Sequence, residues 1–119
     1  MINNFDYPVT EWDVLNEAVN HDQYMRILGK EVVTEWFQLV KNLNPSIKKY
    51  INDYSVLTKN NVRHRKRYYR YIRNLLDSGV PIDGIGFQSH IPKGFNPTSP
   101  EEIIRCLLYT SDAADDLGR

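Results

Sequence analysis

An amide and a carboxylic acid stand side by side at Asn16 and Glu17, within the stretch Trp-Asp-Val-Leu-Asn-Glu-Ala of residues 12–18. A carboxylic acid can give and take back a proton, and a neighbouring amide can hold a hydroxyl group of a substrate. The apolar residues before the pair predict a strand, and the carboxyl ends of parallel strands face the active site in α/β proteins. The pair therefore indicates acid/base chemistry. The alternative for Glu17 is a carboxylate that stabilises the N-terminus of a following helix.

Two further apolar stretches end in polar side chains in the same way. Tyr50-Ile51 leads into Asn52-Asp53-Tyr54, and residues 82–87 lead into Gln88-Ser89-His90. In parallel strands these ends would meet at one edge of the sheet. Each side chain also has an ordinary structural interpretation, as a turn residue, a core aromatic, a partner for buried backbone groups or a buried histidine.

The remaining pattern predicts helices between the three strands. The first strand is expected over residues 9–16, the second around Tyr50-Ile51 and the third over residues 82–87. One helix face is indicated by apolar residues three and four positions apart: Met25, Leu28, Val32, Trp36, Leu39 and Leu43. A second face is indicated by Arg65, Tyr69, Ile72 and Leu76, and a third helix by the capping box Ser99-Pro100-Glu101-Glu102.

Three strand–helix units in succession predict an α/β fold with a parallel sheet. Because each strand ends in polar residues, a partial (β/α)8 TIM barrel is favoured over an open doubly wound sheet. A whole barrel typically needs about 250 residues, so a chain of 119 residues is about half of one.

Composition narrows the function classes. The chain is 41% hydrophobic and 25% charged, and 15 basic and 15 acidic residues give a net charge of zero. This balance argues against nucleic-acid and membrane-surface partners, which favour an excess of Lys and Arg. The basic run Arg63–Arg67 is interpreted as a solvated helix face. The single cysteine, Cys106, excludes an internal disulfide, and no metal site or cofactor is indicated.

Taken together, residues 12–19, 50–54 and 79–90 resemble family ten of the glycoside hydrolases, the retaining endo-β-1,4-xylanases. Their order and spacing match the fourth, fifth and sixth barrel strands of that family, and the likeness covers residues 5–105. Retaining glycosidases use two carboxyl groups about 5–5.5 Å apart, one as acid/base and one as nucleophile. In the family the nucleophile is a Glu at the end of the seventh strand, and no segment of this chain matches it.

The resemblance assigns a role to each polar strand end. It implies that Glu17 is the general acid/base and that Asn16 holds the sugar next to the cleaved bond. It also implies that Gln88 and His90 hydrogen-bond the nucleophile or the sugar. Asn52 and Tyr54 would line the cleft.

These assignments lead to an expectation for the chain as a whole. Residues 1–105 are expected to be part of a xylan-cleaving catalytic domain that is inactive by itself, secreted and free of cofactors. Met1–Asn4 does not resemble a signal peptide. Residues 106–119 resemble a translated sequencing adapter and are expected to be a non-native tail. The alternatives are a fragment of a related β-1,4-glucanase, and a half-barrel with no catalytic function.

Overall fold

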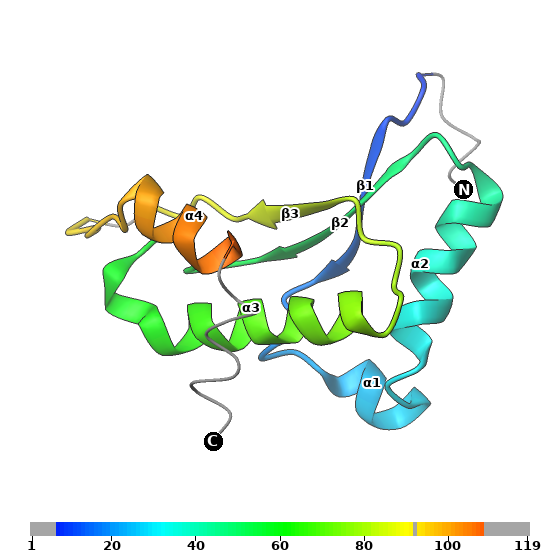
Figure 1. Ribbon diagram of the computed structural model, residues 1–119, viewed down its shortest axis with the longest axis horizontal. Coiled ribbons are helices and arrows are strands. Elements are labelled where there is room, and N and C mark those ends of the chain that lie inside the picture. The colour runs from blue at the N-terminus through cyan, green and yellow to red at the C-terminus, as the bar shows by residue number, and fades with distance from the viewer. Residues whose placement is uncertain (1–6, 92, 109–119) are drawn as a thin grey trace.

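The computed structural model describes residues 7–91 and 93–108. The elements follow one another as strand, helices, strand, helix, strand and helix (Figure 1). Their bounds are β1 Glu11–Asn16, α1 Gln23–Leu28, α2 Val32–Leu43, β2 Lys48–Asp53, the 3-10 turn η1 Lys59–Asn61, α3 Val62–Asp77, β3 Gly84–Phe87 and α4 Pro100–Leu108.

Within the described residues the sheet has three parallel strands in the order β1-β2-β3. Parallel neighbours need a crossover, and the helices after β1 and β2 supply it. The predicted α/β class and parallel sheet are therefore confirmed. β1 begins at Glu11, where the sequence suggested Val9, and β3 begins at Gly84, where it suggested Ile82.

A register shift in β1 sets the direction of its last residues. Asp13 lies opposite Tyr50, but the next residue in register with β2 is Leu15, so β1 carries one extra residue. Side chains alternate between the two faces of a strand, and one extra residue reverses that alternation. Leu15 is consequently buried under the helices and Asn16 is exposed.

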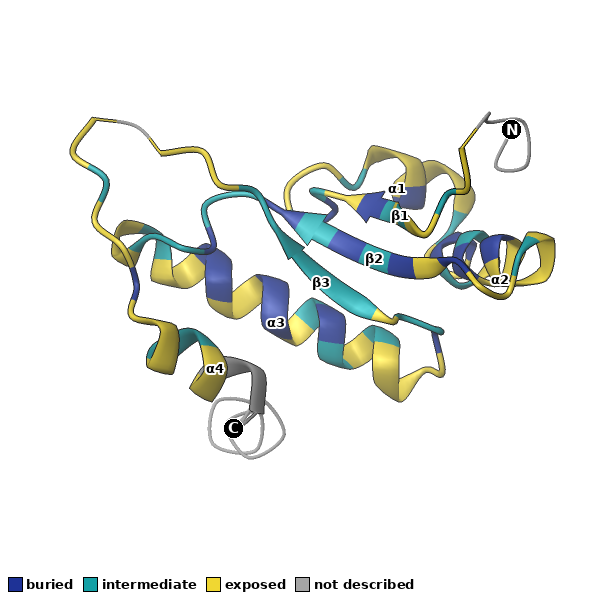
Figure 2. Ribbon diagram, turned by 90° about the horizontal axis from the view of Figure 1, so that it is seen from above, coloured by how far each residue is buried: buried dark blue, intermediate teal, exposed yellow. Residues whose placement is uncertain are grey.

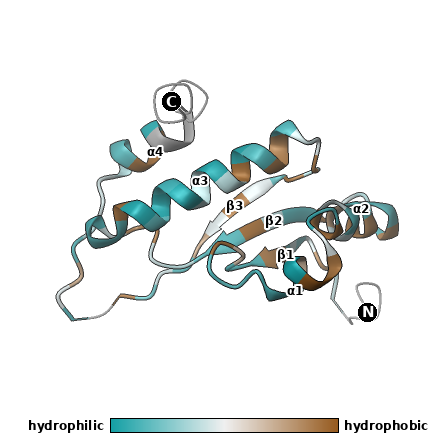
Figure 3. Ribbon diagram, turned by 90° about the horizontal axis from the view of Figure 1, so that it is seen from below, coloured by the Kyte–Doolittle hydropathy of each residue, from teal (hydrophilic) through white to brown (hydrophobic). Residues whose placement is uncertain are grey.

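The core lies between one face of the sheet and the helices α2 and α3. Leu15 and Ile51 from the strands join a cluster with Phe37 of α2 and with Tyr68 and Ile72 of α3. Buried positions recur along β2 and α3 in Figure 2, and Figure 3 shows hydrophobic residues alternating with hydrophilic ones along α3. Each large apolar side chain that is fully buried contributes about 1.5–3 kcal/mol. This packing fixes α3 against the sheet.

The hydroxyl group of Tyr68 adds directional hydrogen bonds to that packing. Burial raises the pKa of Tyr68, so its hydroxyl keeps the proton and donates to the carbonyl oxygens of Ile51 and Gly86, at 2.9 and 3.3 Å. One side chain of α3 therefore contacts both β2 and β3.

The helix predicted from residues 25–43 is in fact two helices. Gly29 has a φ of 91°, and its backbone N–H donates to Met25 O at 3.0 Å, so α1 ends there and α2 starts afresh. The break changes which face of each helix points to the core. Leu28, Leu39 and Leu43, which were expected on the buried face, are 59%, 55% and 50% exposed.

The interpretation of Arg63–Arg67 as a solvated face is wrong for its central residues. His64 and Arg65 are 4% and 1% exposed, whereas Arg63 and Lys66 are exposed. The Nη1 and Nη2 groups of Arg65 donate to the carbonyl oxygens of Val56 and Thr58, the hydroxyl of Thr98 and the carboxylate of Glu102. Its buried Nε has no hydrogen-bond partner among the described residues. Arg65 therefore ties α3 to α4 and to the loop before η1.

The predicted start of the last helix is confirmed, because Ser99 Oγ accepts from Glu102 N at 3.2 Å. Residues 109–119 of the expected tail lie outside the described residues. Among the described helices, none has the length and apolar character that a membrane crossing requires.

A buried lysine fastens the start of β3 to β2. Lys49 is 4% exposed, and its ammonium group bonds to Asp83 Oδ2. The same oxygen accepts from Lys49 N, and Asp83 N donates to Lys49 O, both at 2.9 Å. These hydrogen bonds from Lys49 hold the pKa of Asp83 below its usual value.

We expect Asp83→Asn to lower the free energy of unfolding at pH 7 by about 1 kcal/mol, because 31% of the Asp83 side chain is exposed and solvent screens the pair. A carboxyl whose pKa is lowered by folding stabilises the protein above its unfolded pKa of about 3.9, and the effect is lost as the pH falls further. Urea unfolding at a fixed protein concentration should show the two proteins converging below about pH 4. Asp77→Asn, in an exposed pair with Arg73, is the control; a gap that stays constant into acid would contradict the assignment.

Candidate active site

The candidate site lies at the carboxyl ends of the three parallel strands. Asn16 is the last residue of β1 and Glu17 follows it, while Gln88 directly follows β3. Parallel strands end at the same edge of a sheet, so residues 72 positions apart in the chain come together there.

A single amide links the side chains at this edge. Gln88 Nε2 donates to Glu17 Oε1 at 2.6 Å and to Asn16 Oδ1 at 3.0 Å. Gln88 Oε1 lies 2.8 Å from His90 Nε2, and because an amide oxygen only accepts, His90 is the donor. Four of the six side chains predicted from the sequence, at positions 16, 17, 88 and 90, therefore form one hydrogen-bonded group.

The backbone of Glu17 is held in an unusual conformation. Its φ is 58°, in the left-handed region that costs a residue with a side chain about 1–2 kcal/mol. Glu17 N donates to Asn52 O at 2.9 Å, and Glu17 O accepts from the backbone of Asn20 and His21 at 3.3 and 3.0 Å. These hydrogen bonds compensate for the strain and fix the position of the Glu17 Cα atom, and so the direction in which its side chain leaves the backbone.

The Glu17 carboxylate has a different neighbour on each oxygen. Oε1 is bonded to Gln88, whereas Oε2 lies 3.7 Å from His21 Nε2, and the side chain is 28% exposed. The carboxyl group is thus oriented and reachable from outside. Sequence reasoning missed His21, although its position four residues after Glu17 was a usable signal.

Asn52 and Tyr54 are placed differently from the other four. Asn52 Nδ2 lies 3.4 Å from Asp13 Oδ2, on the sheet face opposite the helices. The Tyr54 hydroxyl accepts from Asn20 Nδ2 at 2.6 Å, and its ring stacks on His64 at 4.9 Å. In the described part of the chain, neither side chain is hydrogen-bonded to the side chains at positions 16, 17, 88 and 90.

The sheet face that carries Asn52 has a hollow of about 480 Å³, lined by Glu11, Trp12, Asp13, Tyr50, Asn52, Gly86 and Phe87. The Tyr50 hydroxyl donates to Glu11 at 3.3 Å. The nearby Glu11 carboxylate raises the pKa of Tyr50, so the phenol keeps its proton. This hollow is polar and borders the strand ends.

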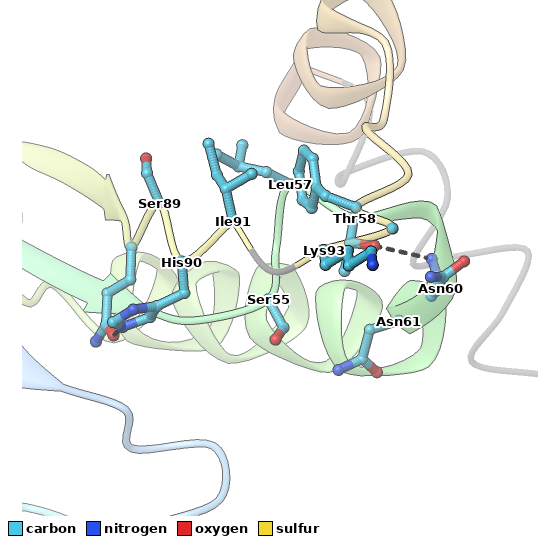
Figure 4. Close-up of a pocket in the computed structure, with 12 residues that line it drawn as sticks. Ser55, Leu57, Thr58, Asn60, Asn61, Ser89, His90, Ile91 and Lys93 are labelled. Atoms are coloured by element: carbon cyan, nitrogen blue, oxygen red, sulfur yellow. Dashed lines mark hydrogen bonds between the residues drawn. The ribbon is translucent and has the colours of Figure 1, made fainter.

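A cavity of about 340 Å³ lies beside His90, between the loop after β2 and the loop after β3. Figure 4 shows side chains reaching it from both loops, among them Ser55, Asn61 and Lys93. The two loops are joined beyond the cavity, where Lys59 N donates to Asn96 O at 2.9 Å and Thr98 N to Leu57 O at 2.7 Å. Hydroxyl, amide and ammonium groups of this kind can hydrogen-bond a ligand rich in hydroxyls.

No group of three or more His, Cys, Asp or Glu side chains that could hold a metal ion occurs in residues 7–91 and 93–108. The expectation that the protein uses no metal remains a prediction.

Gly86 gives the Asn52 side chain its space. A Cβ at residue 86 would lie 2.7 Å from Asn52 Oδ1 and 2.9 Å from Asn52 Cγ. We expect Gly86→Ala to displace Asn52 and lower the free energy of unfolding by about 1–3 kcal/mol. Urea unfolding measures this cost, and most of it should disappear in an Asn52→Ala background, where those two atoms are gone. An undiminished cost there would place the clash elsewhere.

Comparison with known proteins gives consistent results. A sequence family described as Glycosyl hydrolase family 10 matches residues 1–111. The chain is 36% identical over 106 residues to endo-1,4-beta-xylanase 1 of Humicola insolens, which covers 84% of this chain and 24% of that protein.

Solved xylanase structures have the same fold over most of the chain. An intracellular xylanase of Thermoanaerobacterium saccharolyticum, solved as a mutant with xylotriose, matches with a TM-score of 0.70 and 29% identity. Xylanase 10B of Thermotoga maritima matches with a TM-score of 0.68 and 32% identity. Each match covers 87% of this chain and 33% of the solved chain. The chain therefore spans about a third or less of the length of these relatives.

Proposed function

Because the chain belongs to glycosyl hydrolase family 10, we propose that it is part of a retaining endo-1,4-β-xylanase in which Glu17 is the general acid/base. The observation that carries the proposal is the bond from Gln88 Nε2 to Glu17 Oε1, made at the carboxyl ends of parallel strands. It orients a partly exposed carboxyl group at the place where α/β enzymes perform their chemistry.

In this proposal the reaction proceeds in two displacements. Glu17 protonates the glycosidic oxygen while a second carboxylate attacks the anomeric carbon, and a covalent glycosyl-enzyme forms as the leaving sugar departs. Glu17, now ionised, takes a proton from the water that hydrolyses this intermediate and so regains its starting state. Because Gln88 occupies Oε1, Oε2 is the oxygen that carries the transferred proton. The nucleophile comes from outside the described residues.

The other site residues are proposed to hold the sugar chain. Gln88 donates to the amide oxygen of Asn16, which leaves the amide nitrogen of Asn16 to donate to a sugar hydroxyl. His90 orients Gln88, while Asn52 and Tyr54 border the cleft. The similar xylanase that was solved with xylotriose supports xylan as the substrate. Comparing the rates on xylan and on cellulose separates this proposal from a β-1,4-glucanase.

We further propose that the three strand–helix units are the fourth to sixth of a (β/α)8 barrel. The sheet face opposite the helices then points into the barrel, and the free edges of β1 and β3 pair with strands outside the described residues. A secreted location remains a prediction, since one similar structure is of an intracellular xylanase.

In the intact enzyme, Glu17→Ala should reduce kcat/KM for xylan by about two to four orders of magnitude, the usual contribution of acid/base catalysis. An aryl xyloside with a good leaving group needs no protonation, so its kcat/KM should change little. Azide attacks the glycosyl-enzyme without base assistance and should raise kcat on the aryl substrate.

Glu35→Ala, which removes a carboxylate in the first turn of α2, is the control and should leave all three readouts unchanged. Unaltered turnover of xylan by Glu17→Ala would remove Glu17 from the assigned role.

The chain of residues 1–119 produced by itself should not hydrolyse xylan, because the proposed reaction needs a second carboxylate that the described residues do not supply. Unpaired strand edges favour association with other chains, so light scattering should detect dimers or larger species. A soluble monomer that releases reducing sugars from xylan would contradict both expectations.

A further inference from the structure

A polar network with a buried centre and exposed outer residues lies beside the loop that carries Glu17. The resemblance to xylanases gave no role to its residues Asn20, His64 and Arg67. We propose that Asn20, oriented by His64 and Arg67, is a positioning residue that holds Glu17 in its working conformation. The proposal rests on the proposed function, since it concerns the same acid/base.

The innermost part of the network is the pair Asp53 and His64. Their exposed fractions are 0% and 4%, and His64 Nε2 lies 3.0 Å from Asp53 Oδ1. The same carboxylate oxygen accepts from Tyr54 N at 2.7 Å. A buried, hydrogen-bonded pair of this kind is rigid, because separating it would leave a charge in an apolar environment. It provides a fixed point at the end of β2.

Arg67 determines how Asn20 is turned toward that fixed point. Arg67 Nη1 donates to Asn20 Oδ1 at 3.1 Å, so the amide nitrogen of Asn20 faces the other way. This nitrogen lies 3.3 Å from His64 Nδ1 and 2.6 Å from the Tyr54 hydroxyl. Because the amide nitrogen only donates, His64 Nδ1 must accept, and the proton of His64 is on Nε2, facing Asp53. The side-chain groups of Asn20, His64 and Tyr54 then have consistent donor and acceptor roles.

The network reaches Glu17 through the backbone of residues 17–20. Asn20 N donates to Glu17 O at 3.3 Å, and Arg67 Nη2 donates to Val19 O at 2.9 Å. Glu17 has a φ of 58°, which this turn must maintain against its own strain. If Asn20 is released, Glu17 can relax to a more favourable backbone conformation, and its carboxyl group leaves Gln88.

A positioning role and a purely structural role predict different kinetics. Misplacing the acid/base by about 1 Å can cost a hundredfold in rate, but only for substrates that need protonation. A general loss of structure would lower kcat/KM for every substrate in similar proportion. The dependence on the leaving group therefore separates the two roles.

The test uses the intact enzyme with two variants and their matched controls. Asn20→Ala removes the central amide, and Arg67→Ala removes an exposed side chain that α3 can lose without a change in its core. Asn74→Ala and Arg70→Ala are the controls, since both are exposed residues of α3. Thermal unfolding of all four variants establishes that they are folded, and Arg67→Ala serves alone if Asn20→Ala is not.

Asn20→Ala and Arg67→Ala should each lower kcat/KM for xylan by about ten- to a hundredfold. On an aryl xyloside with a good leaving group, the same variants should lower kcat/KM by less than about twofold. The control variants should change neither value. Equal losses on both substrates, or no loss on xylan, would overturn the proposal. Glu17→Ala, measured alongside, separates the two levels of inference. If it lacks the leaving-group dependence, the proposed function itself fails; if it alone shows the dependence, only the role of Asn20 fails.

Discussion

The parallel pairing of β1 with β2, with one extra residue in β1, is the constraint on which the candidate site depends. The register shift between Asp13 and Leu15 sends Leu15 into the core and turns Asn16 to the opposite face. Glu17 N then meets Asn52 O, and the chain enters a left-handed turn. Without the extra residue the alternation of β1 would place Asn16 under the helices. The position of the Glu17 carboxyl group thus follows from a backbone irregularity that packing of Leu15 holds in place.

Apolar burial alone would not fix these positions, because the hydrophobic effect has no direction. Polar pairs with at least one buried partner supply the direction at three places: Lys49 with Asp83 at the start of β3, Asp53 with His64 at the end of β2, and Arg65 with Glu102 between α3 and α4. Burying charge is costly, and a buried ion pair is weak evidence for net stability. Each pair instead joins two segments whose relative position the candidate site depends on.

The parallel sheet and the polar strand ends could be predicted from the sequence, because both follow from local patterns and from the rule that parallel strands end together. The division of residues 25–43 into two helices could not, since a helical spacing of apolar residues does not reveal the φ of 91° at Gly29. The burial of His64 and Arg65 was also missed. Arg65 shared a predicted face with Tyr69 and Ile72, but the groups that accept hydrogen bonds from it, in residues 56–58 and 98–102, lie outside α3. The basic composition of residues 63–67 favoured exposure to solvent, but hydrogen bonds to distant residues allow His64 and Arg65 to be buried.

The opposite face of the sheet supports the proposal that these three strands are part of a closed barrel. It carries Glu11, Asp13, Tyr50 and Asn52, and β3 contributes only Gly84 and Gly86, over which the side chains of Tyr50 and Asn52 extend. A face with two carboxylates could not pack against apolar helices without a large desolvation cost. It is suited to the interior of a closed sheet, where neighbouring strands supply hydrogen-bond donors. Closure of that sheet is also what would bring a second carboxylate to the distance of about 5–5.5 Å from Glu17 that retention requires. In the proposed barrel, the same geometric step therefore completes both the core and the catalytic site.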